Sequence, residues 1–315
     1  MPSSSGAFID FARSVREADV SFMLTGRGHP DWAVRNGRCG SIVIQHGRCG
    51  AGMIADGVMA QPDAVVFVMQ SSLAQHAVAL NGSPVAPYGI AVLPPGSAFV
   101  FANSVPHAWT SITLPVAGLA PGQIERLAGR AERPDASLVE TEAEAFGRIL
   151  GRVAAAPLTP DGYAPDREIA ADRSEDAAGA VCDALFTAIA GADARTEPTA
   201  PHHHLIVRRS LDATAEAAGA VAPIGDLCAA AGVCERTLRR AFSAVFGMPP
   251  SRYLKLRQLN RVHAAMLDDG ARGRRVTDVL TSHGVTELGR FAMQYRALFG
   301  ELPSHTMRRL DHARR

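Results

Sequence analysis

The chain has 315 residues, of which 47% are apolar and 20% charged, a composition typical of a soluble globular protein and a length that allows two domains. No apolar run approaches a membrane span, and Met1–Gly6 lacks the basic segment and apolar core of a signal peptide, so we expect no membrane partner. Five cysteines without a paired framework indicate reduced thiols and a cytoplasmic location.

The net charge of +1 hides an asymmetry between the two parts of the chain. Residues 1–201 hold 14 Lys+Arg and 21 Asp+Glu, a net charge of −7, whereas residues 202–315 hold 18 and 10, a net charge of +8. A basic C-terminal part is the electrostatic pattern of a protein that binds the phosphate backbone of nucleic acid. The acidic remainder is not expected to wrap DNA.

The N-terminal third has the sequence texture of a β-rich domain. Residues 8–20 predict a short amphipathic helix or an edge segment. Asn81-Gly82 is a strong hairpin signal, and Asp56-Gly57 and Pro94-Pro95-Gly96 predict further turns. Many short strands at this spacing favour a small barrel or sandwich. The predicted strands are Ser41–Gln45, Ala51–Ala55, Val65–Gln70, Ala77–Leu80, Ile90–Leu93, Phe99–Ala102 and Trp109–Leu114.

Two cysteines in this region follow the same local sequence, Arg38-Cys39-Gly40 and Arg48-Cys49-Gly50. If the strands that follow them were neighbours, the two thiols would lie close together. A redox switch is one interpretation, because nearby arginines lower a thiol pKa. Two unreactive thiols near turns is the interpretation that we favour.

The histidines of the β-rich part, His29, His46, His76 and His107, are too scattered to predict a metal site. The tract His202–His204 precedes an apolar-periodic segment and is interpreted as a helix start. Neither a cofactor motif nor a Ser-His-Asp order is present, so we expect no cofactor and no enzyme. Candidate contacts to a small molecule are the aromatic residues, which are more often core, and two arginines that suit an anion. These are Trp32, Tyr88, Trp109, Arg35 and Arg38.

After Pro121 the pattern becomes helical. Gln123–Arg130 and Thr141–Val153 are predicted helices, and 154–173 is a predicted loop. Ser174 is predicted to cap a further helix, which is followed by a linker, Gly191–Pro201. The apolar stripe of that helix suits either a dimer seam or packing on the β-rich part; its residues are Ala177, Val181, Leu185 and Ile189.

The segment from Pro223 to Arg309 contains one pattern twice. In each copy a short apolar-periodic segment precedes a glycine, a longer one follows it, and Phe-Gly comes three residues before a proline. The matching positions are Gly232, Phe246-Gly247 and Pro250 in the first copy and Gly284, Phe299-Gly300 and Pro303 in the second. Such self-similarity indicates a repeated supersecondary unit.

Each copy predicts a helix, a short turn and a second helix. Gly232 suits the turn because glycine adopts a positive φ without strain. Cys234 and Thr286 occupy the expected N-cap positions of the second helices, and threonine is the better cap. Helix, turn and helix form the helix-turn-helix pattern, whose second helix can enter a DNA major groove. For one copy, an ordinary α-hairpin with a solvated arginine face is an equally good interpretation; the duplication favours DNA binding.

A long helix is predicted between the two copies. Pro249-Pro250-Ser251 begins it, apolar residues recur at helical spacing, and Asp268-Asp269-Gly270 ends it. A helix of about 18 residues is about 27 Å long. Such a rod suits two recognition helices that lie about one turn of DNA, 34 Å, apart.

These residues closely resemble the DNA-binding domain of the AraC/XylS family of bacterial transcription regulators. The resemblance covers about residues 203–310, and its most specific part is the second-copy pattern with Arg308-Arg309 behind it. Two departures are Val285, where the family has an aromatic residue, and Met293, where a basic residue is common. We therefore expect the second unit to read bases less strongly than the first.

The resemblance implies which side chains face DNA, and a face with arginines agrees with it. In the first unit they are Cys234, Glu235, Arg236, Arg239 and Arg240. In the second they are Thr286, Glu287, Leu288, Gly289, Arg290 and Met293. Arg252, Arg257 and Arg296 are candidates for phosphate contacts, which set register without reading sequence.

The β-rich region resembles, more weakly, the cupin-like sensor domain often placed ahead of such a DNA-binding domain, with Leu93–Phe99 at the barrel turn. That resemblance implies a small-molecule effector, a homodimer formed through nearby helices, which favours the dimer seam, and work with RNA polymerase as an activator.

The predicted fold is therefore α+β with two domains. It has a cupin-like barrel with flanking helices (1–173), a dimerisation helix and linker (174–201), and an all-α domain with two helix-turn-helix units (202–315). The predicted function is that of an effector-responsive transcription regulator that binds double-stranded DNA. The alternatives are a cupin-type metalloenzyme with an appended DNA-binding domain and an effector-independent silencer.

Overall fold

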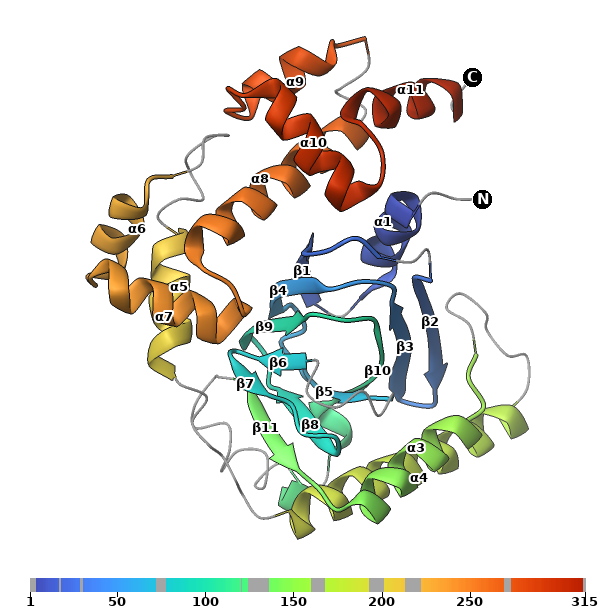
Figure 1. Ribbon diagram of the computed structural model, residues 1–315. Coiled ribbons are helices and arrows are strands. Elements are labelled where there is room, and N and C mark those ends of the chain that lie inside the picture. Colours follow the sequence, from blue (N-terminus) through green and yellow to red (C-terminus); the bar gives the residue numbers. More distant parts are fainter. Residues whose placement is uncertain are drawn as a thin grey trace.

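The computed structural model describes residues 4–16, 18–28, 31–71, 78–119, 121–123, 136–159, 168–192, 201–212, 222–268 and 273–313. The protein is α+β: a β-rich N-terminal part lies beside an all-helical C-terminal part (Figure 1). Within the described residues, no helix is both long and apolar enough to cross a membrane.

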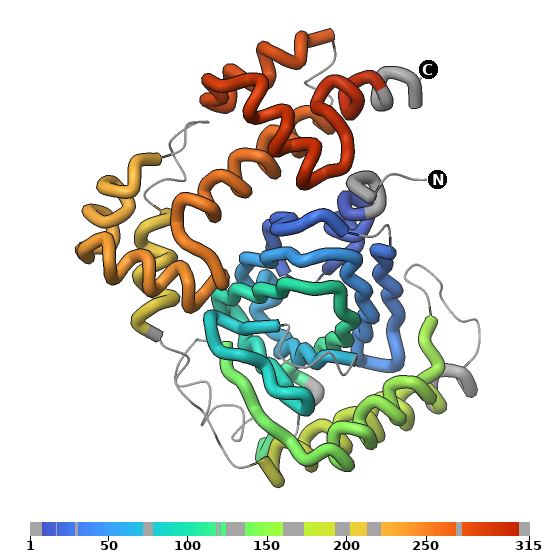
Figure 2. The backbone as a smooth tube through the Cα atoms, in the orientation of Figure 1, coloured from blue at the N-terminus to red at the C-terminus, as the bar shows by residue number. Residues whose placement is uncertain are grey.

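The N-terminal part begins with helix α1 (Ser4–Ser14) and contains two antiparallel sheets that face each other (Figure 2). The five-stranded sheet has the order β1 (Ala18–Leu24), β4 (Met53–Met59), β9 (Ala98–Asn103), β6 (Val78–Leu80) and β7 (Ser83–Pro84). The six-stranded sheet has the order β11 (Ser137–Glu140), β8 (Gly89–Leu93), β5 (Ala64–Gln70), β10 (His107–Pro115), β3 (Ile42–Cys49) and β2 (Ala33–Cys39).

The β-rich part was predicted as a small barrel or sandwich, and its described strands form two separate sheets. The consecutive strands β3 and β4 belong to different sheets, because β3 pairs with β2 and β10 while β4 pairs with β1 and β9. The structure also contains β1, β2 and β11, which the sequence did not predict. Strand β2 lacks a β-branched run, and its hydrogen bonds to β3 hold it in place.

Of the predicted turns, Asn81-Gly82 is confirmed and Asp56-Gly57 is wrong. Asn81 and Gly82 have φ of 51° and 92° and join β6 to β7, as expected for a two-residue hairpin with two positive φ angles. Asp56 and Gly57 lie in the middle of β4 with partners on both sides. Pairing with two neighbouring strands overrides the local turn preference of this dipeptide.

The cysteines Cys39 and Cys49 are far apart. Cys39 ends β2 opposite Ile42, whereas Cys49 ends β3 seven residues further along that strand. Seven residues of extended chain span about 23 Å. Burial raises the pKa of both thiols, that of Cys49 to about 12. The hypothesis that these two thiols form a redox pair is therefore wrong.

Two helices, α3 (Ala143–Ala155) and α4 (Glu168–Gly191), cover the outer face of the six-stranded sheet (Figure 1). The predicted helix at 141–153 is confirmed as α3; residues 124–130 of the other predicted helix lie outside the described residues. A short 3-10 helix, η1 (Val116–Gly118), follows β10.

Helix α4 differs from its prediction in two ways. It begins at Glu168, so Ser174 does not cap it; the Ser174 hydroxyl instead accepts a hydrogen bond from the Gly40 amide at 2.6 Å. The predicted boundary at 173/174 therefore falls inside a helix. The apolar stripe is buried within the monomer, where the ring of Phe186 lies 6.2 Å from that of Phe67. Its use as a dimer seam is wrong, because the sheet already covers it.

The C-terminal part consists of helices with the predicted repeat. They are α5 (Pro201–Asp212), α6 (Ile224–Ala231), α7 (Glu235–Phe246), α8 (Pro250–Leu267), α9 (Val276–Ser282), α10 (Leu288–Phe299) and α11 (Pro303–Ala313). The pairs α6–α7 and α9–α10 are the two predicted helix-turn-helix units, and α8 has the predicted 18 residues. Gly232 ends α6 with φ of 65°. The histidine tract lies in the first turns of α5, as expected.

The two parts share one continuous apolar cluster, to which β1 and β4 contribute together with α7 and α8. Asn260 of α8 accepts a hydrogen bond from the Leu24 amide at 2.9 Å and donates one to the Leu24 carbonyl at 3.0 Å. The tip of the β6–β7 hairpin lies against α7, since a side chain on Gly82 would meet the Ala244 carbonyl at 2.9 Å.

Candidate nucleic-acid interface and internal cavity

Helix α7 presents an exposed face with three arginines. It begins after Cys234, which occupies the N-cap position without capping through its side chain; its sulfur lies 3.3 Å from the Thr237 hydroxyl. Arg239 pairs with Glu235 one turn earlier, with Nη2 and Nε at 2.6 and 3.0 Å from the same carboxylate oxygen. Exposed ion pairs of this kind contribute only about 0.3–0.5 kcal/mol, so DNA phosphate can displace Glu235 at little cost.

A surface hollow of about 700 Å³ lies over this arginine face. It brings together all of the first-unit residues predicted to face DNA except Cys234, and adds two that the sequence did not predict. The lining residues are His203, Glu235, Arg236, Arg239, Arg240 and Ser243. The sequence located His203 at a helix start, but the packing of α5 on α7 is a long-range contact that no local pattern encodes.

Helix α10 presents a face that is less charged and more apolar. Its N-cap is Glu287, and no side chain caps the helix, so the prediction that Thr286 caps it is wrong. Arg290 pairs with Glu287 at 3.3 Å. Leu288 and Met293 are 36% and 66% exposed, unusual for large apolar side chains. Apolar side chains suit contact with the methyl group of thymine.

A buried polar network holds α10 against its neighbours. The Tyr295 hydroxyl contacts Nδ1 of His263 in α8 and lies 2.9 Å from the Thr306 hydroxyl in α11. Thr306 in turn donates to Glu301 at 2.9 Å. The His263 ring also stacks on Phe299, with centroids 4.1 Å apart. The orientation of α10 is therefore fixed by hydrogen bonds as well as by apolar packing.

The three candidate phosphate contacts differ in their surroundings. Arg252 and Arg296 are exposed, whereas Arg257 is half-buried. Burial raises the pKa of the Asp56 carboxyl in β4, and the charges of Arg208 and Arg257 oppose that rise. Arg257 therefore acts electrostatically on the N-terminal part, and Arg252 and Arg296 are the better candidates for DNA.

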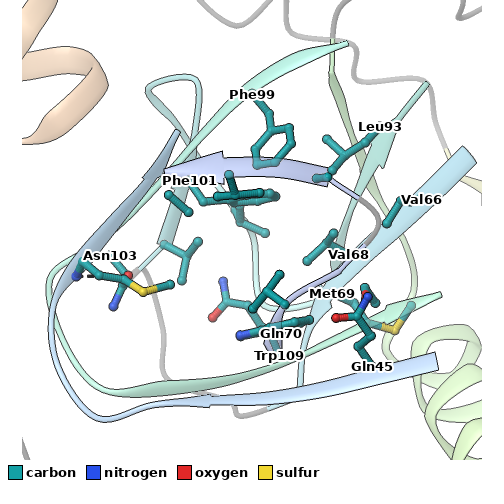
Figure 3. Close-up of a pocket in the computed structure, with 18 of the residues that line it drawn as sticks. Gln45, Val66, Val68, Met69, Gln70, Leu93, Phe99, Phe101, Asn103 and Trp109 are labelled. Carbon is teal, nitrogen blue, oxygen red and sulfur yellow. Dashed lines mark hydrogen bonds between the residues drawn. The ribbon is translucent and has the colours of Figure 1, made fainter. Parts of the chain in front are cut away.

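An internal cavity of about 100 Å³ lies between the two sheets of the N-terminal part (Figure 3). Phe99, Phe101 and Leu93 gather on one side of it, and Gln70 and Trp109 lie on the other. A side chain on Gly47 would meet the Trp109 indole at 2.0 Å, so only glycine leaves room for that ring.

Of the five residues predicted to contact a small molecule, the structure places only Trp109 at the cavity. Trp32 packs among Phe8 and Phe11, with both ring centroids at 5.1 Å. Tyr88 lies on Phe146. Arg35 and Arg38 point to solvent from β2. The structure thus gives Trp32, Tyr88, Arg35 and Arg38 no place in the cavity wall. The two aromatic residues lie just before strands β2 and β8, and the two arginines lie on β2 at the edge of its sheet.

Two polar residues of the cavity wall were missed by the sequence analysis. Gln70 and His107 are only 6% and 9% exposed, and Nε2 of Gln70 and Nδ1 of His107 have no hydrogen-bond partner. The alternation of β5 and β10 could have placed both on one face, had their pairing been known. Among the described residues, no three His, Cys, Asp or Glu side chains gather in a group suited to a metal ion.

Comparison with known proteins identifies the helical part. A family model described as a helix-turn-helix domain matches residues 227–309. The XylDLEGF operon transcriptional activator of Pseudomonas putida is 40% identical over 73 residues, 23% of this chain and 23% of the relative. The chain spans less than a quarter of the first relatives that it matches. The AraC-like transcriptional activator CuxR overlaps loosely, with a TM-score of 0.37 at 11% identity over 84% of this chain and 91% of CuxR.

The family match and the sequence relatives, together with the two helix-turn-helix units joined by α8, define a class: the C-terminal part is a helix-turn-helix DNA-binding domain. More narrowly, this domain is similar to that of the XylDLEGF operon transcriptional activators.

Proposed function

We propose that the protein is a sequence-specific transcription regulator, an activator, that responds to a small molecule bound by its N-terminal part. The observation that carries this proposal is the pair of helix-turn-helix units held by one 18-residue helix, with three arginines gathered in the hollow over α7. Two recognition helices on one rod suit two successive major grooves of DNA.

In this proposal the first unit contributes most of the affinity. Arg236, Arg239 and Arg240 contact guanine or phosphate, because guanidinium groups match both in a bidentate geometry. Cys234 and Glu235 lie at the start of α7, where the backbone approaches DNA. In the second unit, Thr286 to Arg290 and Met293 face the groove and contact bases mainly through apolar side chains.

The other roles follow from the domain division. Residues 202–315 bind double-stranded DNA, while residues 1–173 enclose the cavity and are the sensor. A homodimer, contact with RNA polymerase and a cytoplasmic location complete the proposal, and the chain is not an enzyme. The buried stripe of α4 is excluded as the dimer seam.

Selection of genomic fragments by the purified full-length protein, followed by footprinting of the best fragment, tests the proposal. Protection of two adjacent major grooves is expected. Arg239→Ala should weaken binding by about 1–3 kcal/mol, the range for a bidentate base contact. The matched control is Arg148→Ala, which removes an exposed arginine with the same i,i+4 pairing, to Glu144 at 2.7 Å, from the N-terminal part. Equal affinity of both variants would remove Arg239 from the interface; no enriched fragment, with or without residues 1–201, would overturn the proposal.

A further inference from the structure

The polar end of the cavity is built from two neighbouring strands of one sheet. Trp109 of β10 is the direct partner of Gln70 of β5, and His107 lies two residues before Trp109, on the same face. His107 and Gln70 are therefore diagonal neighbours on adjacent strands, with their backbones about 7–8 Å apart. At this separation their side chains are close enough to share one small polar group.

These two side chains offer one donor and one acceptor. The unpartnered Gln70 atom is the Nε2 amide, which donates. Burial lowers the pKa of His107 to about 4, although a hydrogen bond with the Val105 carbonyl acts to raise it. The ring is therefore neutral at pH 7 and has one N–H. We assign that N–H to Nε2, because Nδ1 has no partner; Nδ1 then presents its lone pair.

The rest of the wall is mainly apolar. The other side of the cavity is apolar, with Phe99, Phe101 and Leu93 (Figure 3). Arg16 is the charged residue on the wall, and the Gln45 side chain binds its backbone at 3.2 and 3.3 Å. On strand β3, Gln45 lies four residues from Cys49, the residue that pairs with His107. Four residues of strand span about 13 Å, so Gln45 is about that far from the level of His107.

We propose that the cavity binds a small, uncharged, mainly apolar molecule through a hydroxyl group, which donates to Nδ1 of His107 and accepts from Nε2 of Gln70. This ligand class rests on the proposed sensor function of the N-terminal part. A hydroxyl satisfies both buried atoms at once, while a hydrocarbon leaves both unpaired, and a carboxylate presents no donor to Nδ1. Trp109, the direct partner of Gln70, forms the floor beside them.

The test is calorimetric titration of the full-length protein at pH 7 with three probes of similar size: phenol, toluene and benzoate. Phenol should bind about 30-fold more tightly than either of the others, since each of the two satisfied hydrogen bonds contributes about 1 kcal/mol. Gln70→Met and His107→Leu should each remove this preference. Thr113→Val is the matched control. It removes a hydroxyl of β10 that also has no hydrogen-bond partner but does not line the cavity.

Both variants replace a buried atom that has no partner, so they should retain or raise the melting temperature, and a thermal melt separates a defect in binding from a defect in folding. Toluene equal to phenol, benzoate tighter than phenol, or a preference that survives both variants would overturn the ligand class. Footprinting with and without phenol separates the two proposals. Selective binding with unchanged protection supports the ligand class and counts against the sensor role.

Discussion

The two recognition helices have the same length and opposite character. Both α7 and α10 have 12 residues and end at Phe-Gly, so their positions correspond one to one. Arg236, Arg239 and Arg240 of α7 stand where α10 has Gly289, Ala292 and Met293. One scaffold thus carries a charged surface in the first unit and a nearly neutral one in the second. The difference indicates that the first unit supplies affinity and the second discriminates by shape and methyl contacts.

The inner faces of the two helices differ as well. Phe242 of α7 packs against the Tyr253 ring at 5.5 Å, an apolar contact. The corresponding Tyr295 of α10 carries the hydroxyl that connects α8, α10 and α11. The first unit is fixed from outside, by α5 and by the β6–β7 hairpin against Ala244, while the second is fixed by its own buried polar groups.

The largest expected effect tests the difference between the exposed faces of α7 and α10. Replacing Arg236, Arg239 and Arg240 together by alanine should lower specific DNA affinity by at least about 100-fold. The salt dependence should fall by about one counterion for each phosphate that an arginine no longer neutralises. Replacing Leu288 and Met293 together by alanine should cost about tenfold, with little change in salt dependence, because apolar side chains release no counterions. Fluorescence anisotropy at several salt concentrations measures both.

Base preference gives this prediction a second readout. The α10 variant should lose discrimination at thymine positions, while the α7 variant should weaken binding to all sequences and lose discrimination at guanine positions. If the α10 variant showed the larger loss of affinity or the steeper change in salt dependence, the assignment of roles to the two units would be reversed.

The second prediction concerns the buried network of the second unit. Tyr295→Phe should lower the free energy of unfolding by about 2 kcal/mol, because His263 and Thr306 lose a buried partner. Urea denaturation measures this change. Tyr88→Phe is the control, since that ring is 36% exposed and its hydroxyl can bind water. A Tyr295 variant as stable as the control would mean that apolar packing alone holds α10.

The sequence predicted the helical part far better than the β-rich part, for a physical reason. A helix-turn-helix unit is encoded within about 25 residues, and Gly232, Phe246-Gly247 and Pro250 mark its boundaries through local backbone preferences. The 18-residue length of α8 follows from the same kind of signal. Where local preference competes with packing, prediction fails, as for the α4 start, where Ser174 binds the Gly40 amide instead of capping.

The cavity could not be predicted because strand pairing is long-range. Trp109 faces inward through the register of β10 with β5, for which the sequence contained no signal. Gln70 and His107 lie 37 positions apart in the chain and meet only through that pairing. Residue type favoured aromatic side chains and arginines, whereas the unpartnered polar atoms of the wall belong to an amide and an imidazole.

The third prediction tests how the N-terminal part holds the scaffold of both units. Asn260→Ala removes two hydrogen bonds to Leu24 and should cost about 1 kcal/mol, since each such bond contributes little net stability. The Leu24 amide should exchange its hydrogen several-fold faster, as measured by mass spectrometry or NMR. Asn260→Asp keeps the acceptor for that amide and should be intermediate. Unchanged exchange in both variants would mean that apolar contacts alone dock α8 on β1.

The smallest expected effect concerns the thiol of Cys234, which has no counterpart in the second unit. Cys234 is exposed at the start of α7, and hydrogen bonds from Thr237 lower its pKa, whereas Glu287 takes the matching place before α10. A lower pKa means more thiolate at neutral pH, so Cys234 should react with iodoacetamide several-fold faster than Cys228, whose pKa is raised. Bound DNA should slow the labelling of Cys234 and leave that of Cys228 unchanged, as read by peptide mass spectrometry.

Cys234→Ser should keep its DNA affinity, because serine retains the small polar group at the N-cap. Protection of Cys228 rather than Cys234 would mean that DNA approaches α6, and the comparison between α7 and α10 would then concern the wrong pair of surfaces.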